Sequence, residues 1–305
     1  MKIIDFTATH IDQATQIAIQ NYDEEREHVP ALPPIEKITF AENNLGVAAF
    51  EGDRMLGFLC AVGPFKNAFR STDATGVFSP MGANGVIGDN RAKVYALLYQ
   101  AAGAKWARAG AASHAVCLYA HDKEAQKQFF RYGFGMRCVD AIRGMDEIPA
   151  QAREGYSFSE LEDILKILPF ENMLDKSYLD SPFFMYREPS SEIENFQSIY
   201  FVAKYDNKIV AFIRAELDGE NFIQETPGYL HCKGLYCLPE HRGKGISQKL
   251  LNMLLHKLKS QGYTRLGVDF ESFNPSGSGF WLKYFTAYTH SVVRRIDEFV
   301  VEKGS

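Results

Sequence analysis

The sequence lacks any long apolar run. No stretch of its 305 residues approaches the ~20 apolar residues that a membrane-spanning helix requires. The first twenty residues include Asp5 and Asp12 and contain no apolar core of signal-peptide length. We therefore expect no secretion signal and no membrane association.

Runs of basic residues are also missing. The net charge is −5, and lysine and arginine do not gather in any one stretch. A nucleic-acid-binding surface usually needs such a cluster, so we expect no nucleic-acid partner. The acidic balance slightly favours a cationic or small amine as ligand, because long-range charge steers ligands toward a protein.

Cysteines are few, odd in number and unpaired in spacing. The five are Cys60, Cys117, Cys138, Cys232 and Cys237, and no CxxC occurs. In a chain of this length, that usage indicates buried, reduced thiols and a cytoplasmic location. No His/Cys pairs stand at ligand spacing, so we expect no metal site.

The residues that are present describe an ordinary globular protein. Hydrophobic residues make up 46% and charged residues 23% of the chain, and the length is sufficient for two domains. Apolar runs separated by Glu51-Gly52-Asp53-Arg54 and by Asp206-Asn207 predict one hairpin in each half. Ser159, with Glu162 three residues later, has the spacing of a capping box and predicts a helix over residues 159–168.

Residues of the two halves also match at a constant distance. Phe129-Phe130 and Phe280-Trp281 are 151 positions apart, and the same distance relates Arg143 to Arg294, each followed by an acidic pair. A period this long indicates a duplicated domain rather than a solenoid, the alternative being chance similarity of two α/β halves. We predict domains at residues 1–150 and 151–305.

The stretch from Tyr229 to Leu251 is the most informative part of the sequence. A mostly apolar strand runs to Leu238, the polar turn P-E-H-R-G-K-G follows, and leucines at helical spacing begin at Leu250. The first amides of a helix have no internal partner, and glycines let a backbone turn its amides toward an anion. The pattern therefore predicts a phosphate-binding turn. It is not a P-loop, because GxxxxGK is absent, nor a dinucleotide site, because GxGxxG is absent.

Residues Cys237 to Ser247, C-L-P-E-H-R-G-K-G-I-S, resemble the acetyl-CoA motif of the GNAT (GCN5-related N-acetyltransferase) superfamily. The downstream stretch V-D-F-E-S-F-N-P from Val268, followed by Phe280-Trp281, resembles the second signature of that family. The whole chain resembles a tandem, two-copy GNAT protein. The resemblance implies an α/β fold of two GNAT-like domains, each a mixed, mainly antiparallel sheet flanked by helices.

The resemblance also implies how acetyl-CoA, as cosubstrate, would be bound. The strand at Leu235, Tyr236 and Cys237 would splay from its neighbour and pair with the pantetheine arm, and Asn274 and Trp281 would lie beside the cofactor. The pyrophosphate would be held by the backbone of the turn, which comprises Arg242, Gly243, Lys244, Gly245, Ile246 and Ser247.

The N-terminal copy departs from this pattern. Its counterpart of the turn, residues 79–88, contains Gly82, Gly85 and Gly88 but no arginine at the motif position. By resemblance we interpret it as degenerate, with acetyl-CoA binding lost or altered. The simpler interpretation of the three glycines is a turn with no ligand.

Candidates for proton transfer are less well defined than the turn. Alternation along the strand would place His231, Lys233, Leu235 and Cys237 on one face, and a histidine has a pKa suited to a base near neutrality. Asp269 and Glu271 flank Phe270 at the end of the next strand, and we retain Glu271 as a candidate. Each of these residues could instead have a purely structural role. Cys232 and Cys237 show no partner base and are expected to pack as small apolar groups.

The position where many family members place an acid-acting tyrosine, seven residues after Asn274, is Trp281. An indole N–H is no general acid at neutral pH. Tyr284 and Tyr288 lie nearby in sequence but off that spacing, and Tyr288 is retained as a candidate acid.

The sequence therefore predicts an N-acetyltransferase whose C-terminal domain moves acetyl from acetyl-CoA to a small-molecule or peptide amine by direct attack. One alternative is a non-catalytic acyl-CoA-binding or scaffold protein, and another is a transferase of a different acyl group. The sequence leaves the acceptor and the oligomeric state open.

Overall fold

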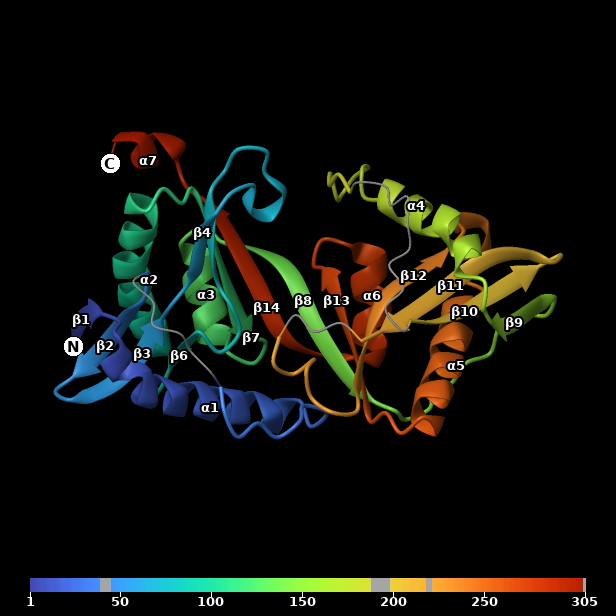
Figure 1. The fold of residues 1–305 in the computed structure, drawn as a ribbon, viewed down its shortest axis with the longest axis horizontal. Coiled ribbons are helices and arrows are strands. Elements are labelled where there is room, and N and C mark those ends of the chain that lie inside the picture. The colour runs from blue at the N-terminus through green and yellow to red at the C-terminus, as the bar shows by residue number, and fades with distance from the viewer. Residues whose placement is uncertain (39–44, 188–197, 218–220, 304–305) are drawn as a thin grey trace. The chain divides into compact units, whose positions relative to one another are not determined.

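The computed structural model describes residues 1–38, 45–187, 198–217 and 221–303 (Figure 1). The chain forms two compact units. Unit 1 contains Met1–Val139 together with Ala287–Ser305, and unit 2 contains Asp140–Thr286. No helix among the described residues is long and apolar enough to cross a membrane.

Unit 1 contains two small sheets. One is antiparallel, with the order β1-β2-β3-β6, and the other has the order β4-β5-β7-β14. Within the second, β5 and β7 are parallel, and β14 pairs antiparallel with β7 from Thr289↔Tyr119 to Arg295↔Ser113. The elements are β1 (Lys2–Asp5), α1 (Ile11–His28), β2 (Val47–Glu51), β3 (Arg54–Leu59), β4 (Val62–Phe65), β5 (Gly76–Ser79), β6 (Asn84–Val86), α2 (Arg91–Arg108), β7 (Ser113–Tyr119), α3 (Lys123–Arg131), β14 (Thr286–Arg295) and α7 (Glu298–Lys303).

The core of unit 1 lies between α2, α3 and the strands. Trp106 on α2 is fully buried, and Leu98, Val116 and Phe129 pack in the same cluster. Val292 on β14 belongs to this cluster too. A strand from the far end of the sequence therefore completes both the sheet and the core of the N-terminal unit.

Unit 2 is built on one continuous sheet with the order β13-β12-β11-β10-β9. Only β12 and β13 are parallel, and the other pairs are antiparallel. The elements are β9 (Tyr156–Glu160), α4 (Leu168–Lys176), β10 (Ile199–Tyr205), β11 (Lys208–Glu216), β12 (Tyr229–Cys237), α5 (Ile246–Ser260), β13 (Arg265–Glu271) and α6 (Pro275–Tyr284), with short 3-10 turns at Ile164–Ile167 and Pro239–His241. β8 (Gly135–Gly144) crosses the boundary between the two units.

Helices cover the two faces of the unit 2 sheet. Figure 1 shows α4 and α5 on opposite sides of strands β10 to β12. Ile167, just before α4, packs on Val202 and Phe212 of one face. The leucines of α5, from Leu250 to Leu258, are buried against the other. This arrangement confirms the predicted α/β class, with mixed, mainly antiparallel sheets flanked by helices.

Both predicted hairpins are present, as β2–β3 and β10–β11. Their turns use positive φ at Gly52 (59°) and at Asp206 and Asn207 (48° and 61°). The helix predicted over residues 159–168 is wrong at its start: Tyr156–Glu160 is strand β9, and helical structure begins at Ile164. Five backbone pairings with β10 outweigh the local capping signal of Ser159.

Apart from β4 and β6, which have no counterpart in the second half, and α7, which has none in the first, the two halves have the same order of helices and strands. β8 and β14 begin and end 151 residues apart. The compact units do not coincide with the sequence halves, because β14 pairs with β7 and joins unit 1. The predicted division at residue 150 describes copies along the sequence and stays a prediction.

Candidate functional site

The turn between β12 and α5 has the backbone geometry of an anion cradle. Gly243 and Gly245 have φ of 71° and 79°, a conformation that favours glycine. Gly245 is the N-cap of the 15-residue helix α5, and no side chain caps it. The N-cap residue therefore gives the first amides of α5 no side-chain partner, and the helix dipole favours an anion beside them.

Gly245 is required by packing as well as by conformation. A Cβ there would lie 2.3 Å from the carbonyl oxygen of Gln151 and 3.1 Å from the Cα of Ala152. The amide of Arg153 donates to the carbonyl oxygen of Lys244 at 3.1 Å. Residues 151–153 thus support the turn from its carbonyl side. At Gly243, by contrast, a Cβ would meet no described atom within 4 Å.

The basic side chains of the turn brace its backbone. Arg242 Nε donates to the carbonyl of Cys237 at 2.9 Å, and its guanidinium lies 5.7 Å from the ring centre of Tyr236. Lys244 Nζ donates to the carbonyl of Glu240 at 2.8 Å. The anion-binding capacity of the turn therefore comes from its backbone amides, with two cations beside them.

Strands β12 and β13 separate just before the turn. Their parallel pairing runs from Tyr229↔Arg265 to Cys232↔Val268. Within the described residues it does not continue, while β12 remains paired with β11 as far as Cys237. Leu235–Cys237 therefore has no β13 partner among the described residues, as the family resemblance implied.

A β-bulge at Lys233 changes which side chains of β12 share a face of the sheet. Pairing with β11 shifts there by one residue, so that His231 lies opposite Glu216 and Tyr236 lies opposite Phe212. Both of those β11 residues lie on the face covered by α4. The prediction that His231 shares a face with Leu235 and Cys237 is wrong, because the extra residue reverses the alternation.

His231 forms the centre of a hydrogen-bonded chain. Its side chain is 1% exposed, with Nδ1 2.9 Å from the Tyr229 hydroxyl and Nε2 2.8 Å from Asp269 Oδ1. A carboxylate only accepts, so Nε2–H donates to Asp269 and the Tyr229 hydroxyl donates to Nδ1. Gly267 makes room for this arrangement, since a Cβ there would lie 1.7 Å from the Tyr229 oxygen.

Asp269 is the accessible end of this chain. Its side chain is 36% exposed, in contrast to the buried imidazole. Burial opposes its ionisation, but the hydrogen bond from His231 and the nearby cations Lys233 and Arg187 outweigh burial and lower the pKa of Asp269. The sequence showed Asp269 only as a neighbour of Glu271. The sequence contained one signal for Asp269 as a site residue. His231 and Asp269 lie on two strands that pair in parallel, so their side chains could be expected to meet.

The other predicted site residues of unit 2 lie on β13 and α6. Glu271 ends β13, and its carbonyl accepts from the amide of Asn274 at 3.0 Å. The Asn274 carboxamide oxygen caps α6 by accepting from Gly277 N at 2.7 Å. Trp281 is 7% exposed and packs on Phe280 and Phe285. Their contacts with a cofactor stay predictions.

Tyr288 lies on β14 and belongs to unit 1. It is fully buried, and its carbonyl accepts from the amide of Ala120 at 3.0 Å. Its role as an acid stays a prediction.

The cysteines of β12 are unsuited to nucleophilic attack. Burial raises the pKa of the Cys232 thiol to about 12 and that of Cys237 to about 11. The thiolate is the reactive form, so both are inert at neutral pH. All five cysteines are free, as the sequence predicted.

The corresponding region of unit 1 is filled by the protein's own side chains. β5 and β7 pair only from Gly76↔Ser113 to Ser79↔Val116. Beyond that point Asn84 Nδ2 donates to the carbonyl of Cys117 at 3.0 Å and to Ser79 Oγ at 3.1 Å. This buried carboxamide therefore bridges the position where the strands of unit 2 stay apart.

The first turn of α2 is likewise surrounded by carboxylates. Glu124 accepts from the amide of Ala92 at 3.4 Å, and Arg91 pairs with Glu24 and with Asp122. A phosphate group would meet these negative charges. This agrees with the predicted degenerate character of the N-terminal copy.

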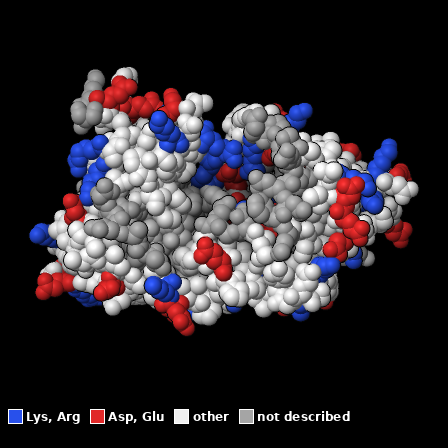
Figure 2. All heavy atoms as spheres, in the orientation of Figure 1, with Lys and Arg blue, Asp and Glu red and all other residues white. Residues whose placement is uncertain are grey.

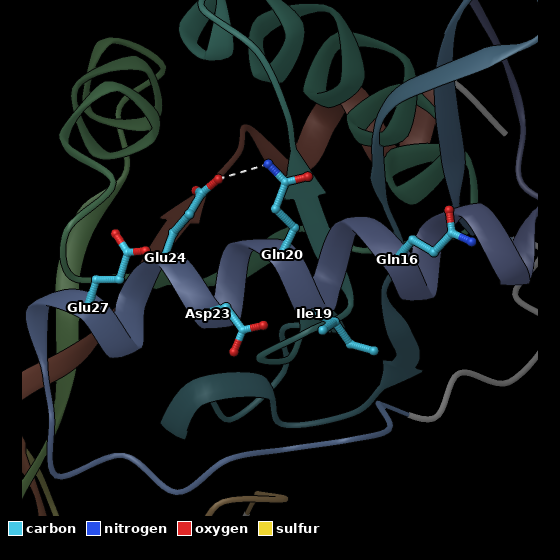
Figure 3. Close-up of a pocket in the computed structure, with 6 residues that line it drawn as sticks. All are labelled: Gln16, Ile19, Gln20, Asp23, Glu24 and Glu27. Carbon is cyan, nitrogen blue, oxygen red and sulfur yellow. Dashed lines mark hydrogen bonds between the residues drawn. The ribbon is translucent and has the colours of Figure 1, made fainter.

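A surface hollow in unit 1 lies along α1 (Figure 3). Its lining residues are Gln16, Ile19, Gln20, Asp23, Glu24 and Glu27, all from that helix, and Gln20 Nε2 donates to Glu24 at 3.0 Å. The hollow offers carboxylates and amides but no anion cradle. Elsewhere on the face shown in Figure 2, acidic and basic side chains are interspersed.

Residues 161–285 match the Acetyltransferase (GNAT) family. This match covers the C-terminal part of the chain and includes the turn between β12 and α5.

Solved structures extend the likeness to both copies. A GCN5-related N-acetyltransferase from Sphaerobacter thermophilus superposes with a TM-score of 0.53 at 12% identity, over 96% of this chain and 95% of that one. One from Kribbella flavida gives 0.45 at 10% identity, over 91% and 94%. A tandem GNAT protein from the clavulanic acid biosynthesis pathway gives 0.44 at 12% identity, over 96% and 98%. No curated protein sequence gave a significant match.

Proposed function

We propose that the C-terminal GNAT domain binds acetyl-CoA and transfers its acetyl group to a primary amine by direct attack. The observation that carries this proposal is the continuity of Leu235–Ser247. At one end of this segment, Leu235–Cys237 has no β13 partner among the described residues, and at the other end lies the N-terminus of α5, which no side chain caps. A free strand edge pairs with an extended arm, and a helix N-terminus holds phosphate. Together they suit a pantetheine arm linked to a pyrophosphate.

The predicted cofactor residues fit this assignment. Leu235, Tyr236 and Cys237 would pair with the pantetheine arm, and the amides between Arg242 and Ser247 would hold the pyrophosphate. Asn274 and Trp281, on α6, complete the predicted set.

Acetyl-CoA supplies an activated thioester, and the chain must align the amine with it and remove a proton. A backbone N–H near Leu235 donates to the carbonyl oxygen as negative charge develops. Asp269 is the only end of the Tyr229–His231–Asp269 chain with substantial exposure, so it accepts a hydrogen bond from the amine. The amine nitrogen would bond to the thioester carbonyl carbon, the C–S bond would break, and CoA would leave as a thiolate. His231 fixes the carboxylate of Asp269, which takes up the proton that the amine loses and passes it to water.

This assignment changes the role predicted for His231 from direct base to positioning residue, because a side chain that is 1% exposed cannot contact an acceptor. Glu271 remains a candidate second carboxylate.

The test combines binding and turnover. Acetyl-CoA and CoA should raise the unfolding temperature, whereas ATP should not, and free thiol should then appear with at least one amine of a broad panel. Absence of any shift with acetyl-CoA would overturn the cofactor assignment.

A non-catalytic acyl-CoA-binding protein is the second candidate. It is favoured by Trp281, which is buried in packing with Phe280 and Phe285 where the family often places its acid. Acetyl-CoA binding without thiol release above buffer for every amine would establish this alternative instead.

A further inference from the structure

A buried polar cluster lies between α1 and the end of β7 in unit 1. Tyr22 and Glu25 are one turn apart on α1, Tyr119 is the last residue of β7, and His121 follows it. The ring centre of Tyr119 lies 6.3 Å from that of Tyr22 and 6.4 Å from that of His121. Glu25 Oε2 accepts from the His121 amide at 3.1 Å and from His121 Nδ1. These contacts bring the carboxylate of Glu25 and the phenol of Tyr119 to the same imidazole.

Two polar atoms of this cluster have no partner. Glu25 is 0% exposed and Tyr119 is 8% exposed. Glu25 Oε1 and the Tyr119 hydroxyl oxygen are both buried without a hydrogen-bond partner among the described residues. Buried polar atoms are nearly always hydrogen-bonded, and an unsatisfied one marks a place for a bound water, ion or ligand. Two such atoms beside one imidazole therefore indicate a bound group.

The neighbouring cations do not supply the missing partner. Arg91 pairs with Glu24 and with Asp122, and Lys123 Nζ donates to a backbone carbonyl at 2.6 Å. Neither cation forms an ion pair with Glu25 among the described residues, and the imidazole donates only to the other carboxylate oxygen. A buried carboxylate is costly unless it is paired and hydrogen-bonded. The missing group must therefore donate a hydrogen bond, and a positive charge suits it best.

The cluster is reached from the surface past an imidazole. His121 is 14% exposed, and its Nε2 lies 3.8 Å from Glu24, which lines the hollow along α1 (Figure 3). The exposed residue His28 stacks on His121, with ring centres 5.1 Å apart. Two imidazoles thus stand between solvent and the carboxylate of Glu25, so the ligand must be small.

We propose that Glu25 and Tyr119 bind a small primary ammonium ion in the N-terminal unit. Its N–H groups donate to Glu25 Oε1 and to the Tyr119 hydroxyl oxygen, and its charge balances the buried carboxylate. The faces of the Tyr22 and Tyr119 rings add attraction for a cation. The site lies outside the proposed acetyl-transfer site and does not depend on it, because all of its residues belong to unit 1.

Calorimetry of the whole chain with methylammonium chloride tests this site. The titrations use an Asp269→Asn background, so that the acceptor site proposed in unit 2 does not contribute. One equivalent should bind saturably. Tetramethylammonium, which has no N–H, and methanol, which has no charge, should bind about tenfold or more weakly, the usual effect of losing a hydrogen bond between charged groups.

Two variants and a matched control locate the binding. Tyr119→Phe, which removes only the hydroxyl, and Glu25→Gln should each raise Kd for methylammonium by about tenfold or more. Glu27→Gln should leave Kd unchanged, because Glu27 is an exposed residue of the same helix. A crystal structure at saturating methylammonium should show its nitrogen within hydrogen-bond distance of Glu25 Oε1.

The absence of saturable binding would overturn the site. So would equal affinity for methanol, or a single ordered water on Glu25 Oε1 at saturating methylammonium, since either would show that a neutral group satisfies the cluster. An unchanged Kd in Tyr119→Phe would also refute it, and this variant decides the matter if Glu25→Gln does not fold. None of these outcomes bears on acetyl transfer in unit 2.

Discussion

Asp269 connects the buried, hydrogen-bonded side chains of Tyr229 and His231 to solvent. The hydrogen bond from His231 keeps it ionised, so its carboxylate can accept a hydrogen bond from an amine and relay the amine's proton to water. We predict that Asp269→Asn lowers kcat/KM about 10²- to 10⁴-fold, the usual range for loss of a proton-transfer group, while acetyl-CoA binding persists. Steady-state thiol release and calorimetry measure the two effects separately.

His231→Gln provides the matched comparison, because it perturbs Asp269 without removing the carboxylate. Its loss of activity should be smaller than that of Asp269→Asn. If His231→Gln were the more damaging change, the imidazole itself would be the base.

His114 in unit 1 illustrates a buried histidine with a structural role. It is 1% exposed, with Nδ1 3.0 Å from the Tyr99 hydroxyl and Nε2 3.1 Å from the carbonyl of Ala111. The neutral ring satisfies both contacts, donating from Nε2 and accepting at Nδ1. Burial, together with the charge of Arg294, lowers its pKa from 6.5 to about 4, although the Ala111 hydrogen bond opposes this change.

This lowered pKa predicts a loss of stability in acid. The unfolded chain takes up the proton near pH 6.5 and the folded protein only near pH 4, so stability is present above pH 6.5 and lost as pH falls between those values. The contribution is on the order of 3 kcal/mol. Urea unfolding at pH 7.5 and 4.5 should show a larger loss for the wild type than for His114→Gln. Equal losses would contradict the assignment.

Among the elements, strand β12 shows where sequence reasoning succeeds and where it fails. The order strand, turn, helix followed from apolar runs and glycines, and the structure has it at the predicted residues. The bulge at Lys233 could not be predicted, because an extra residue in a strand has no compositional signature and is defined only by its partner β11. One residue of register moved His231 to the other face and changed the predicted site.

The helix predicted at the start of unit 2 was wrong for a related reason. Ser159 and Glu162 have capping-box spacing, but Tyr156–Glu160 pairs with β10 instead. Local spacing cannot report a partner strand forty residues away along the chain.

The cradle before α5 allows a test with a matched pair of glycines. Gly243 and Gly245 both have positive φ, so either alanine substitution strains the backbone by about 1–2 kcal/mol. Only at Gly245 does a Cβ also meet a backbone oxygen, at 2.3 Å from Gln151. We predict that Gly245→Ala abolishes the thermal shift with acetyl-CoA, and that Gly243→Ala retains most of it. Similar behaviour of the two variants would refute the special role of Gly245.

At the scale of the whole molecule, the sequence predicted a duplication but not the pairing of the strands. β8 and β14 are equivalent in the repeat, so their sequences cannot tell which sheet each one joins. Only tertiary contacts assign β14 to β7, and with it Val292 to the core around Trp106.

This assignment predicts that a change near the end of the sequence weakens the N-terminal unit. Val292→Ala should destabilise unit 1 by about 1–3 kcal/mol, through loss of buried methyl groups. In a Trp281→Phe background, fluorescence of Trp106 reports its unfolding directly. Leu282→Ala is the control, since that side chain on α6 is 50% exposed. An unchanged Trp106 transition in Val292→Ala would contradict the assignment of β14.

The same strand has a consequence for how the protein is made. Domains usually fold in the order in which they leave the ribosome, the N-terminal one first. Here residues 140–286 form a unit from one continuous segment. The sheet of the N-terminal unit, by contrast, is incomplete until residues 287–295 have been synthesised. During translation the C-terminal unit therefore has its full set of residues first. Along β7 the N-terminal unit keeps an edge that can pair with another chain until β14 emerges and covers it.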